Sequence, residues 1–145
     1  MKKLSIIIPA YNEDKTILKV LNQVNATKSD KINYEVIVVD DGSTDDTKNI
    51  LNANSHLYDQ LISNEKNIGK GGAVKIGIET ATGDYIIFQD ADLEYDPQDI
   101  IKFINVFTEF DADVIIGSRF SYDRYTKSHS FYNKIGNKVI TIIFN

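Results

Sequence analysis

Cysteine is absent from the 145-residue sequence, and histidine occurs only at His56 and His129. Without cysteine the chain can form no disulfide framework and no thiolate zinc site, and it has no cysteine nucleophile. Two histidines argue against a histidine-rich metal site, and we assign neither of them a role. The first apolar run, residues 4–8, is too short for a signal peptide or a membrane span.

Charge is unevenly distributed, although the composition is that of one ordinary globular domain, with 42% hydrophobic and 26% charged residues. Residues 1–118 hold 20 Asp and Glu against 11 Lys and Arg, whereas residues 119–145 hold five Lys and Arg against Asp123 alone. The acidic body argues against a broad basic surface for nucleic acid, so we expect no nucleic-acid partner.

Short apolar runs alternate with amphipathic stretches. They predict strands at residues 4–8, 34–39, 61–62, 85–88 and 114–116, with helices that begin near residues 17, 46, 73 and 97. Asn12 or Asp14 could cap the first helix. This alternation indicates an α/β fold, a mostly parallel sheet with helices on both faces. We assign residues 1–120 to this core and 121–145 to a basic and aromatic C-terminal segment, typical of a truncated helix of a longer domain.

Polar clusters follow four of the predicted strands, at residues 9–13, 40–45, 90–94 and 117–119. The carboxyl ends of parallel strands lie at one edge of the sheet, and ligands bind beyond that edge in such folds. The sequence therefore predicts one site, built from all four clusters.

The strongest chemical signal is Asp90-Ala91-Asp92, at the end of the strand expected at residues 85–88. Two carboxylates on one short turn repel each other unless a cation compensates them. Oxygen ligands without histidine or cysteine suit Mg²⁺ or Mn²⁺, and Glu94 could supply a third oxygen. The alternative is a solvated acidic turn, which is common for Asp in loops.

Asp41 and Arg119 each have an ordinary structural alternative. Asp41 could accept a hydrogen bond from a nucleobase, or it could begin a turn in which Ser43 or Asp45 caps the next helix. Arg119 could pair with a diphosphate, although a lone arginine is more often a surface residue.

Lys70 lies in a glycine-rich segment, Gly69–Gly72, that resembles a phosphate-binding loop. The segment fails the Walker A pattern, because Asn64 and Gly71 replace the required glycine and the required Ser or Thr. It also lacks the last glycine of a dinucleotide-binding loop. We favour a flexible entry to a helix that begins near Ala73 over direct phosphate contact, and we retain Lys70 as a candidate substrate-binding residue.

The C-terminal segment combines its cations with the aromatic residues Tyr122, Tyr125, Phe131 and Tyr132. Packing of a short helix is the ordinary explanation. The sharper interpretation is a surface that touches lipid headgroups or a lipid acceptor, and hence peripheral membrane contact.

Five motifs, in order and at suitable spacing, resemble those of the family-two glycosyltransferases of the GT-A fold. They are Pro9-Ala10-Tyr11-Asn12-Glu13, Val38-Val39-Asp40-Asp41-Gly42-Ser43-Thr44-Asp45, Gly69-Lys70-Gly71-Gly72-Ala73, Asp90-Ala91-Asp92 and Gly117-Ser118-Arg119. The similarity covers nearly the whole chain up to Phe120 and is greatest to the polyprenyl-phosphate sugar synthases, such as dolichyl-phosphate mannose or glucose synthases. Those enzymes continue well beyond this length, so we expect an N-terminal catalytic-domain fragment.

The resemblance implies a role for each matching residue. Those that would line the nucleotide pocket and its base subsite are Pro9, Tyr11, Glu13, Val39 and Asp41. Those that would hold the ribose, the divalent ion and the diphosphate are Asp90, Ala91, Asp92 and Arg119. Glu94 stands where mannose synthases often carry Gln, so its identity departs from that pattern.

The implied function is inverting transfer of a hexose from a UDP- or GDP-linked sugar to an acceptor, with a polyprenyl phosphate favoured. A cation on Asp92, helped by Arg119, would stabilise the charge on the leaving nucleoside diphosphate. The implied location is the cytoplasm, where the protein could contact the cytoplasmic face of a membrane. Two alternatives stay open: a haloacid-dehalogenase-type phosphatase, whose aspartyl-phosphate motif resembles Asp90-Ala91-Asp92, and a non-catalytic nucleotide-binding fragment.

Overall fold

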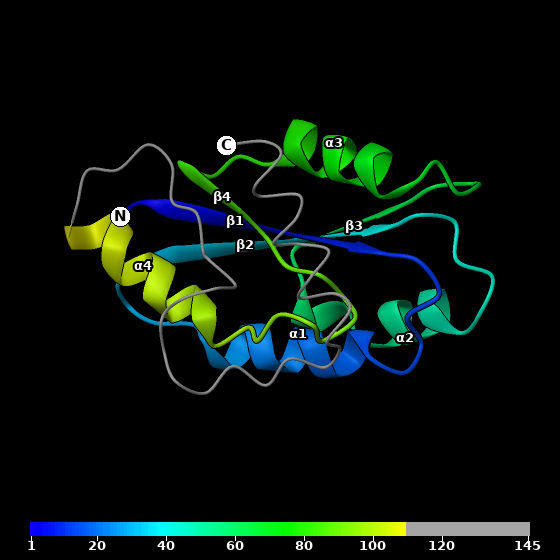
Figure 1. Cartoon of the computed structure of the whole chain (residues 1–145), viewed down its shortest axis with the longest axis horizontal. Helices are drawn as coiled ribbons and strands as arrows, with labels where there is room; N and C mark the ends of the chain where they lie inside the picture. The colour runs from blue at the N-terminus through cyan, green and yellow to red at the C-terminus, as the bar shows by residue number, and fades with distance from the viewer. Residues whose placement is uncertain (110–145) are drawn as a thin grey trace, which may run out of the picture. The chain divides into compact units, whose positions relative to one another are not determined.

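Four apolar segments form a sheet in which all strands run in the same direction. The structure is a computed structural model and describes residues 1–109, so the strand expected at 114–116, Arg119 and the segment 121–145 lie outside the described residues. The strands are β1 (Lys3–Ala10), β2 (Asn33–Asp40), β3 (Gln60–Ser63) and β4 (Tyr85–Phe88). They pair in parallel in the spatial order β3-β2-β1-β4 (Figure 1). The predicted α/β fold is confirmed.

The two central strands, β1 and β2, are covered on both faces. They pair over eight residues, from Lys3 opposite Asn33 to Ala10 opposite Asp40. Side chains alternate between the faces, so Ile6 packs in one core cluster while its neighbour Ile7 faces the other side, and both are 0% exposed. The continuous apolar runs of the sequence are explained by this double coverage.

Strand β1 continues through Pro9, where the sequence predicted that it would stop. The neighbouring strand β4 ends at Phe88, and the carbonyl of Ile7 accepts a hydrogen bond on that side from the N–H of Gln89 (3.0 Å). The backbone nitrogen of Pro9 points to the same side of β1 as the backbone of Ile7, because the two residues are two positions apart, but Pro9 lies beyond the end of β4. Its missing N–H therefore costs no bond to β4, and the strand extends to Ala10.

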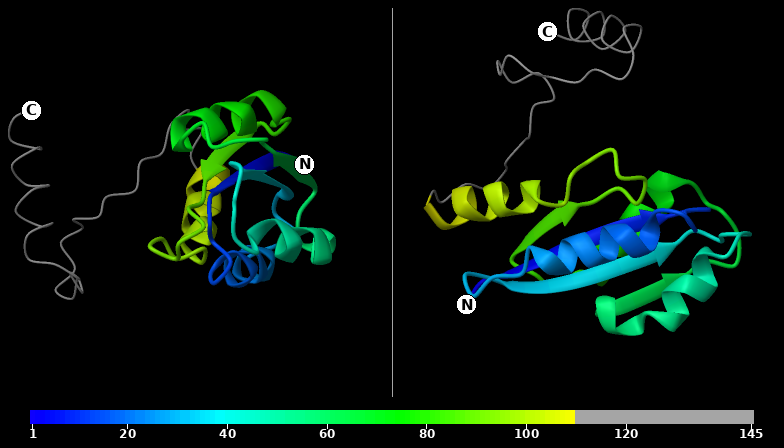
Figure 2. Two further views of the ribbon diagram at one scale, coloured as in Figure 1. Left: turned by 90° about the vertical axis from the view of Figure 1, so that its right-hand side faces the viewer. Right: turned by 90° about the horizontal axis from the view of Figure 1, so that it is seen from below.

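Helices cover both faces of the sheet, as predicted (Figures 1 and 2). On one face lies α3 (Lys70–Thr80), and on the other lie α1 (Ile17–Ala26), α2 (Thr47–Ala53), the 3-10 helix η1 (Ser55–Leu57) and α4 (Asp99–Glu109). The larger core joins β1 and β2 to α1, α2 and α4, and the smaller core joins β2 to α3. Within residues 1–109, no helix combines the length and the apolar character needed to cross a bilayer.

The capping of α1 differs from the sequence prediction, although its start at Ile17 agrees with it. The helix begins at Ile17, and its first turn is closed by the carbonyl of Glu13, which accepts hydrogen bonds from the N–H groups of Thr16 (3.1 Å) and Ile17 (2.9 Å). Neither Asn12 nor Asp14 caps it, because the Asn12 side chain bonds the loop after β2 instead.

The start of α3 differs from the prediction, since the helix begins at Lys70 rather than near Ala73. Gly71 and Gly72 are poor helix formers, and each costs about 1 kcal/mol of helix stability relative to alanine. For this reason the sequence predicted a helix start that is too late. Tertiary contact overrides that preference. Asp41 holds the N–H of Gly69 (2.8 Å), and Ala73 donates to the carbonyl of Gly69 (3.1 Å), which closes the first turn.

Helix α3 lies very close to the sheet at Gly77. A Cβ atom at this position would lie 2.4 Å from Cγ2 of Ile7 on β1, a separation that real structures do not tolerate. Glycine therefore allows the close contact that sets the height of α3, and with it the height of Lys70, above the sheet.

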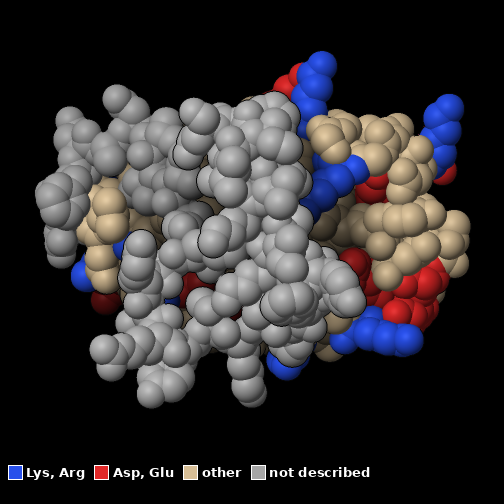
Figure 3. Space-filling model, in the orientation of Figure 1, with Lys and Arg blue, Asp and Glu red and all other residues tan. Residues whose placement is uncertain are grey.

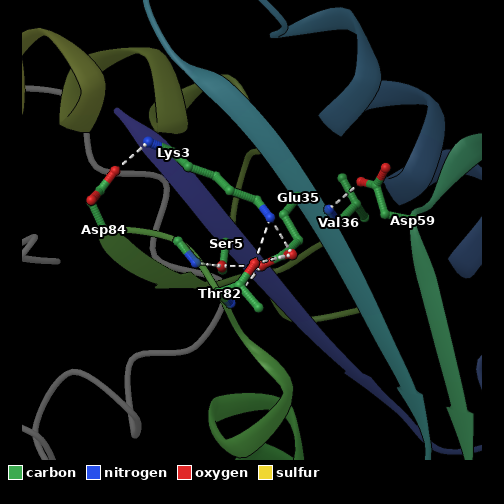
Figure 4. A network of polar contacts seen from close by, with 8 residues as sticks. Lys3, Ser5, Glu35, Val36, Asp59, Thr82 and Asp84 are labelled. Atoms are coloured by element: carbon green, nitrogen blue, oxygen red, sulfur yellow. Dashed lines mark hydrogen bonds and ion pairs between the residues drawn. The ribbon is translucent and has the colours of Figure 1, made fainter. Parts of the chain in front are cut away.

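One carboxylate is buried near the amino-terminal end of β2. Glu35 is 4% exposed and accepts hydrogen bonds from Lys3 Nζ (2.5 Å), Ser5 Oγ (2.5 Å), Thr82 N (2.8 Å) and Thr82 Oγ1 (2.6 Å) (Figure 4). Burial alone would raise the pKa of Glu35, but these hydrogen bonds outweigh burial and lower the pKa from 4.5 to about 2. The network joins both central strands to the loop between α3 and β4.

Candidate active site

A pocket of about 240 Å³ opens at the carboxyl edge of the sheet. It is formed by the segments that follow β1, β2, β3 and β4, together with the start of α3, and is lined by Pro9, Ala10, Tyr11, Glu13, Asp41, Asn67, Lys70, Ala73, Asp90, Ala91 and Asp92. Figure 3 shows acidic side chains gathered at the right-hand end of the molecule, toward which β1 and β2 point in Figure 1. Three of the four predicted polar clusters thus meet at one edge.

Eight of the predicted site residues line this pocket: Pro9, Tyr11, Glu13, Asp41, Lys70, Asp90, Ala91 and Asp92. Val39, expected at the base subsite, is instead fully buried and packs with Ala73 beneath α3. Glu94 is exposed and does not line the pocket. The side chain of Val39 faces α3 because side chains alternate along β2, an alternation that a motif match alone does not resolve.

The loop after β1 is bonded to the loop after β2. Asn12 N donates to Ser43 Oγ (3.0 Å), Asn12 Oδ1 accepts from Thr44 N (2.8 Å), and Glu13 N donates to Thr47 Oγ1 (2.8 Å). Asn12 has a φ of 56°, a left-handed conformation that asparagine adopts more readily than most residues. These bonds place Tyr11 and Glu13 on the rim of the pocket.

Asp41 binds the loop after β3. The side chain is 2% exposed; its Oδ1 accepts hydrogen bonds from Asn64 Nδ2 (2.8 Å) and Ile68 N (3.0 Å), and its Oδ2 accepts one from Gly69 N (2.8 Å). The adjacent Gly42 has a φ of 71°, and a Cβ there would lie 2.6 Å from the neighbouring loop's backbone. Asp41 therefore holds the segment that leads into α3 while also lining the pocket.

The turn after β2 begins at Asp40 rather than Asp41. Asp40 Oδ1 accepts a hydrogen bond from Ser43 N (3.1 Å), and Asp45 Oδ1 accepts one from the N–H of Thr47 (3.0 Å), the first residue of α2. Burial would raise the pKa of Asp45, but hydrogen bonds from Thr47 and from the backbone outweigh burial and lower it. Of the two predicted capping residues, Asp45 thus contacts the helix start, and Ser43 bonds Asn12 instead.

Gln89 positions the acidic turn and was missed by the sequence analysis. It is 3% exposed, and its Nε2 donates to the backbone carbonyls of Asp90 (3.1 Å) and Tyr95 (3.1 Å). Within the turn, Glu94 N donates to Asp92 Oδ1 (2.9 Å), which orients the Asp92 carboxylate. The only sequence signal for Gln89 was a polar residue between an apolar strand and the acidic pair.

The two aspartates of the turn have different partners. Asp90 Oδ1 lies 2.7 Å from Lys70 Nζ, and the two side chains are 16% and 66% exposed. Asp92 is exposed and forms no ion pair with a Lys or Arg of residues 1–109. Asp90 is therefore already paired with a protein cation, whereas Asp92 is accessible to a ligand.

This arrangement fits a divalent cation that arrives with a phosphorylated ligand. In the described part of the chain no group of three or more His, Asp or Glu side chains is placed to hold a metal, so Glu94 does not complete a three-carboxylate set with Asp90 and Asp92. Mg²⁺ is often held by only one or two carboxylates, with water and substrate phosphates completing its coordination. Two carboxylates facing one pocket meet that requirement.

A parallel α/β sheet with an acidic pocket at its carboxyl edge is typical of nucleotide-binding α/β proteins. The chain belongs to glycosyl transferase family 2, which its residues 5–141 match. The family-two resemblance of the sequence is thereby confirmed. The phosphatase alternative has no support, and the acidic pair follows the fourth strand rather than the first.

Several curated proteins are similar in sequence. An uncharacterized protein, MJ0544, of Methanocaldococcus jannaschii is 39% identical over 78% of this chain and 50% of its own length. A dolichol-phosphate mannosyltransferase of Pyrococcus furiosus is 35% identical over 94% of this chain and 38% of its own. An undecaprenyl-phosphate 4-deoxy-4-formamido-L-arabinose transferase of Proteus mirabilis is 31% identical over 97% and 42%. The chain thus spans half or less of the length of these relatives.

Solved structures of glycosyltransferases share the fold. S. aureus TarS 1–349 in complex with UDP has a TM-score of 0.65 and 29% identity, covering 74% of this chain and 32% of that one. The mannosyltransferase PcManGT of Pyrobaculum calidifontis, in complex with GDP-Man and Mn²⁺, has a TM-score of 0.61 and 27% identity, covering 72% and 31%. The GT-A fold class is therefore confirmed.

Proposed function

We propose that this chain binds a nucleoside-diphosphate sugar with Mg²⁺ or Mn²⁺ in the carboxyl-edge pocket, and that the protein transfers the hexose with inversion to a polyprenyl phosphate. The observation that carries the proposal is that Asp41, Lys70, Asp90 and Asp92 line one pocket in a member of this family. The names of two relatives, which specify dolichol-phosphate and undecaprenyl-phosphate transfer, support the acceptor class. Solved relatives in complex with UDP or with GDP-Man and Mn²⁺ support the donor class.

We assign the pocket residues to different parts of the donor according to their chemistry. Tyr11 and Asp41 lie on the side of the pocket that we assign to the nucleoside, and Asp92 and Lys70 lie on the side that we assign to the diphosphate. Arg119, outside the described residues, is proposed to pair with the diphosphate as well. When bound, the divalent cation would offset the negative charge that develops on the leaving diphosphate. The pocket is smaller than the roughly 300–1,000 Å³ of typical ligand sites, so we assign it only part of the donor.

The partners of three carboxylates in the pocket favour an acceptor that is already anionic, because these carboxylates are engaged and a general base is then not needed. Glu13 Oε2 accepts a hydrogen bond from Thr16 Oγ1 (2.6 Å), Asp41 holds the loop after β3, and Asp90 pairs with Lys70. These three carboxylates are thus engaged within the protein. A sugar hydroxyl would need a general base, whereas a phosphate oxygen carries its charge before it attacks.

A polyprenyl-phosphate acceptor would bring the protein to a membrane surface. We therefore also propose a cytoplasmic protein in which the basic segment 121–145 makes peripheral contact with the cytoplasmic face of a membrane, since cations and aromatic side chains favour anionic headgroups. This segment lies outside the described residues.

The test is a thermal-shift panel of the full chain with UDP, GDP, UDP-glucose and GDP-mannose, each with and without Mn²⁺. We expect stabilisation by one nucleotide series only when Mn²⁺ is present, because the cation bridges carboxylate and diphosphate. No stabilisation by any of the four would contradict the proposed donor class. Turnover with a polyprenyl-phosphate acceptor then separates an active transferase from a non-catalytic nucleotide-binding fragment.

A further inference from the structure

The ion pair between Lys70 and Asp90 lies in the pocket to which the proposed function assigns a divalent cation. We propose that Lys70 is a tethered counter-ion: its ammonium group pairs with Asp90 and so opposes the binding of free divalent cations to that carboxylate. When the diphosphate of the donor binds, Lys70 moves to the diphosphate and releases Asp90. The inference rests on the proposed function for the identity of the donor. Its central test, however, needs only the metal.

The backbone on either side of Lys70 is fixed. Just before it, Gly69 N donates to Asp41 Oδ2 (2.8 Å). Just after it, α3 is anchored by Ala73, which is fully buried and donates to the carbonyl of Gly69 (3.1 Å). The side chain of Lys70, in contrast, is 66% exposed. The backbone at Lys70 is therefore held in place while its side chain is exposed, so the ammonium group can exchange partners without a movement of the helix.

Charge makes the ammonium group and a free cation competitors. Lys70 Nζ is 2.7 Å from Asp90 Oδ1, so a cation that bound Asp90 would have to displace Lys70 or accept a positive charge nearby. Asp92 has no such partner among the Lys and Arg side chains of residues 1–109. Within residues 1–109, Asp90 is therefore paired with a cationic side chain and Asp92 is not.

A diphosphate reverses this competition. Lysine is a compact point charge on a flexible stem and binds phosphate oxygens well, and Lys70 and both aspartates line the same pocket. Once Lys70 Nζ moves to the diphosphate, Asp90 is free to join Asp92 at the cation. The cation and the nucleoside diphosphate should then bind cooperatively, and the coupling must be reciprocal.

The experiment is a Mn²⁺ titration of the full chain without nucleotide, with free Mn²⁺ followed by electron paramagnetic resonance. Wild type is compared with Lys70→Met and with the matched control Lys75→Met. Lys75 lies on the same helix, is 77% exposed and pairs only loosely with Glu79 (3.9 Å). We expect Lys70→Met to bind Mn²⁺ on the order of tenfold more tightly than wild type, because both the competing ion pair and the nearby positive charge are removed. Lys75→Met should match wild type.

Equal Mn²⁺ affinities of wild type and Lys70→Met, or no detectable binding by either, would overturn the proposal. Repeating the titration with saturating UDP or GDP tests whether Lys70 moves from Asp90 to the diphosphate. The nucleotide should increase Mn²⁺ affinity more in wild type than in Lys70→Met, and an equal increase would refute transfer of Lys70 to the diphosphate. If neither nucleotide binds wild type with Mn²⁺, the proposed function fails, while the titration with metal alone still decides the role of Lys70.

Discussion

Glu35 and Asp92 are carboxylates at opposite ends of the parallel sheet, and their surroundings differ. Near the amino-terminal end, Glu35 is 4% exposed and is surrounded by donors from Lys3, Ser5 and Thr82. At the carboxyl edge, Asp92 is exposed and bonded to the backbone N–H of its own turn (2.9 Å). A carboxylate enclosed by protein donors stabilises the fold, whereas a carboxylate on the rim is accessible to a ligand.

The difference follows from how the chain is connected at each end. Near the amino end, the loop between α3 and β4 closes directly over Glu35 through Thr82, and Asp84 adds a bond to Lys3 N (2.7 Å). At the carboxyl edge the loops bond mainly to one another, through Asn12 and Asp41. A space lined by polar groups is left between them, and there the candidate site lies.

The largest expected effect comes from Asp92→Ala, which removes the accessible carboxylate of this pair. We expect loss of Mn²⁺-dependent nucleotide binding, because the accessible carboxylate is removed, with stability changed by no more than about 0.5 kcal/mol at this exposed position. Nucleotide titration with and without Mn²⁺, together with thermal unfolding, measures both effects. The control Glu65→Ala removes an exposed carboxylate outside the pocket and should change neither. Unchanged Mn²⁺-dependent binding in Asp92→Ala would refute the assignment of Asp92 to the cation.

The converse substitution, Glu35→Gln, should affect stability and not the site. We expect a loss of about 1–3 kcal/mol in the free energy of unfolding, because Lys3 loses its charged partner and an amide cannot accept all the hydrogen bonds that the carboxylate accepts. Urea denaturation measures this loss. Glu79→Gln is the control: its carboxylate is 64% exposed and 3.9 Å from Lys75, so its loss should cost less than about 0.5 kcal/mol. Equal stability of the two variants would remove the structural role assigned to Glu35.

The smallest effect is the pH dependence of the Glu35 contribution. Its pKa is about 2 in the folded protein, below the ordinary value of 4.5, so the folded state favours the charged carboxylate. The resulting stability is fully present above the unfolded pKa and declines as the pH falls from about 5 toward 2. The difference in unfolding free energy between wild type and Glu35→Gln should therefore shrink over this range. A difference that stays constant between pH 6 and pH 3 would contradict the lowered pKa.

The prediction from sequence succeeded where a pattern depends on residues close together in the chain. The strand at Tyr85–Phe88 and the start of α2 at Thr47, next to the predicted residue 46, were placed correctly, because periodicity and turn residues are local signals. It failed where distant contacts decide. The start of α3 depends on a bond from Asp41, 28 positions before Gly69, and the continuation of β1 through Pro9 depends on where β4 ends.

The candidate site was only partly predictable for the same reason. The motifs named most of the residues that line the pocket, yet they could not tell that Val39 faces α3 or that Gln89 supports the acidic turn. Nor could they reveal that Lys70 is paired with Asp90, because the two residues are 20 positions apart and meet only when α3 packs beside β1 and β2.

The order of residues alone determined the α/β class, the parallel sheet and the edge at which the acidic turn lies, since alternating apolar runs permit few other arrangements. Only the tertiary structure decided which carboxylate is enclosed, which is paired and which is accessible. Burial and ion pairing depend on side chains brought together from separate elements, and no local pattern of residues encodes that assembly.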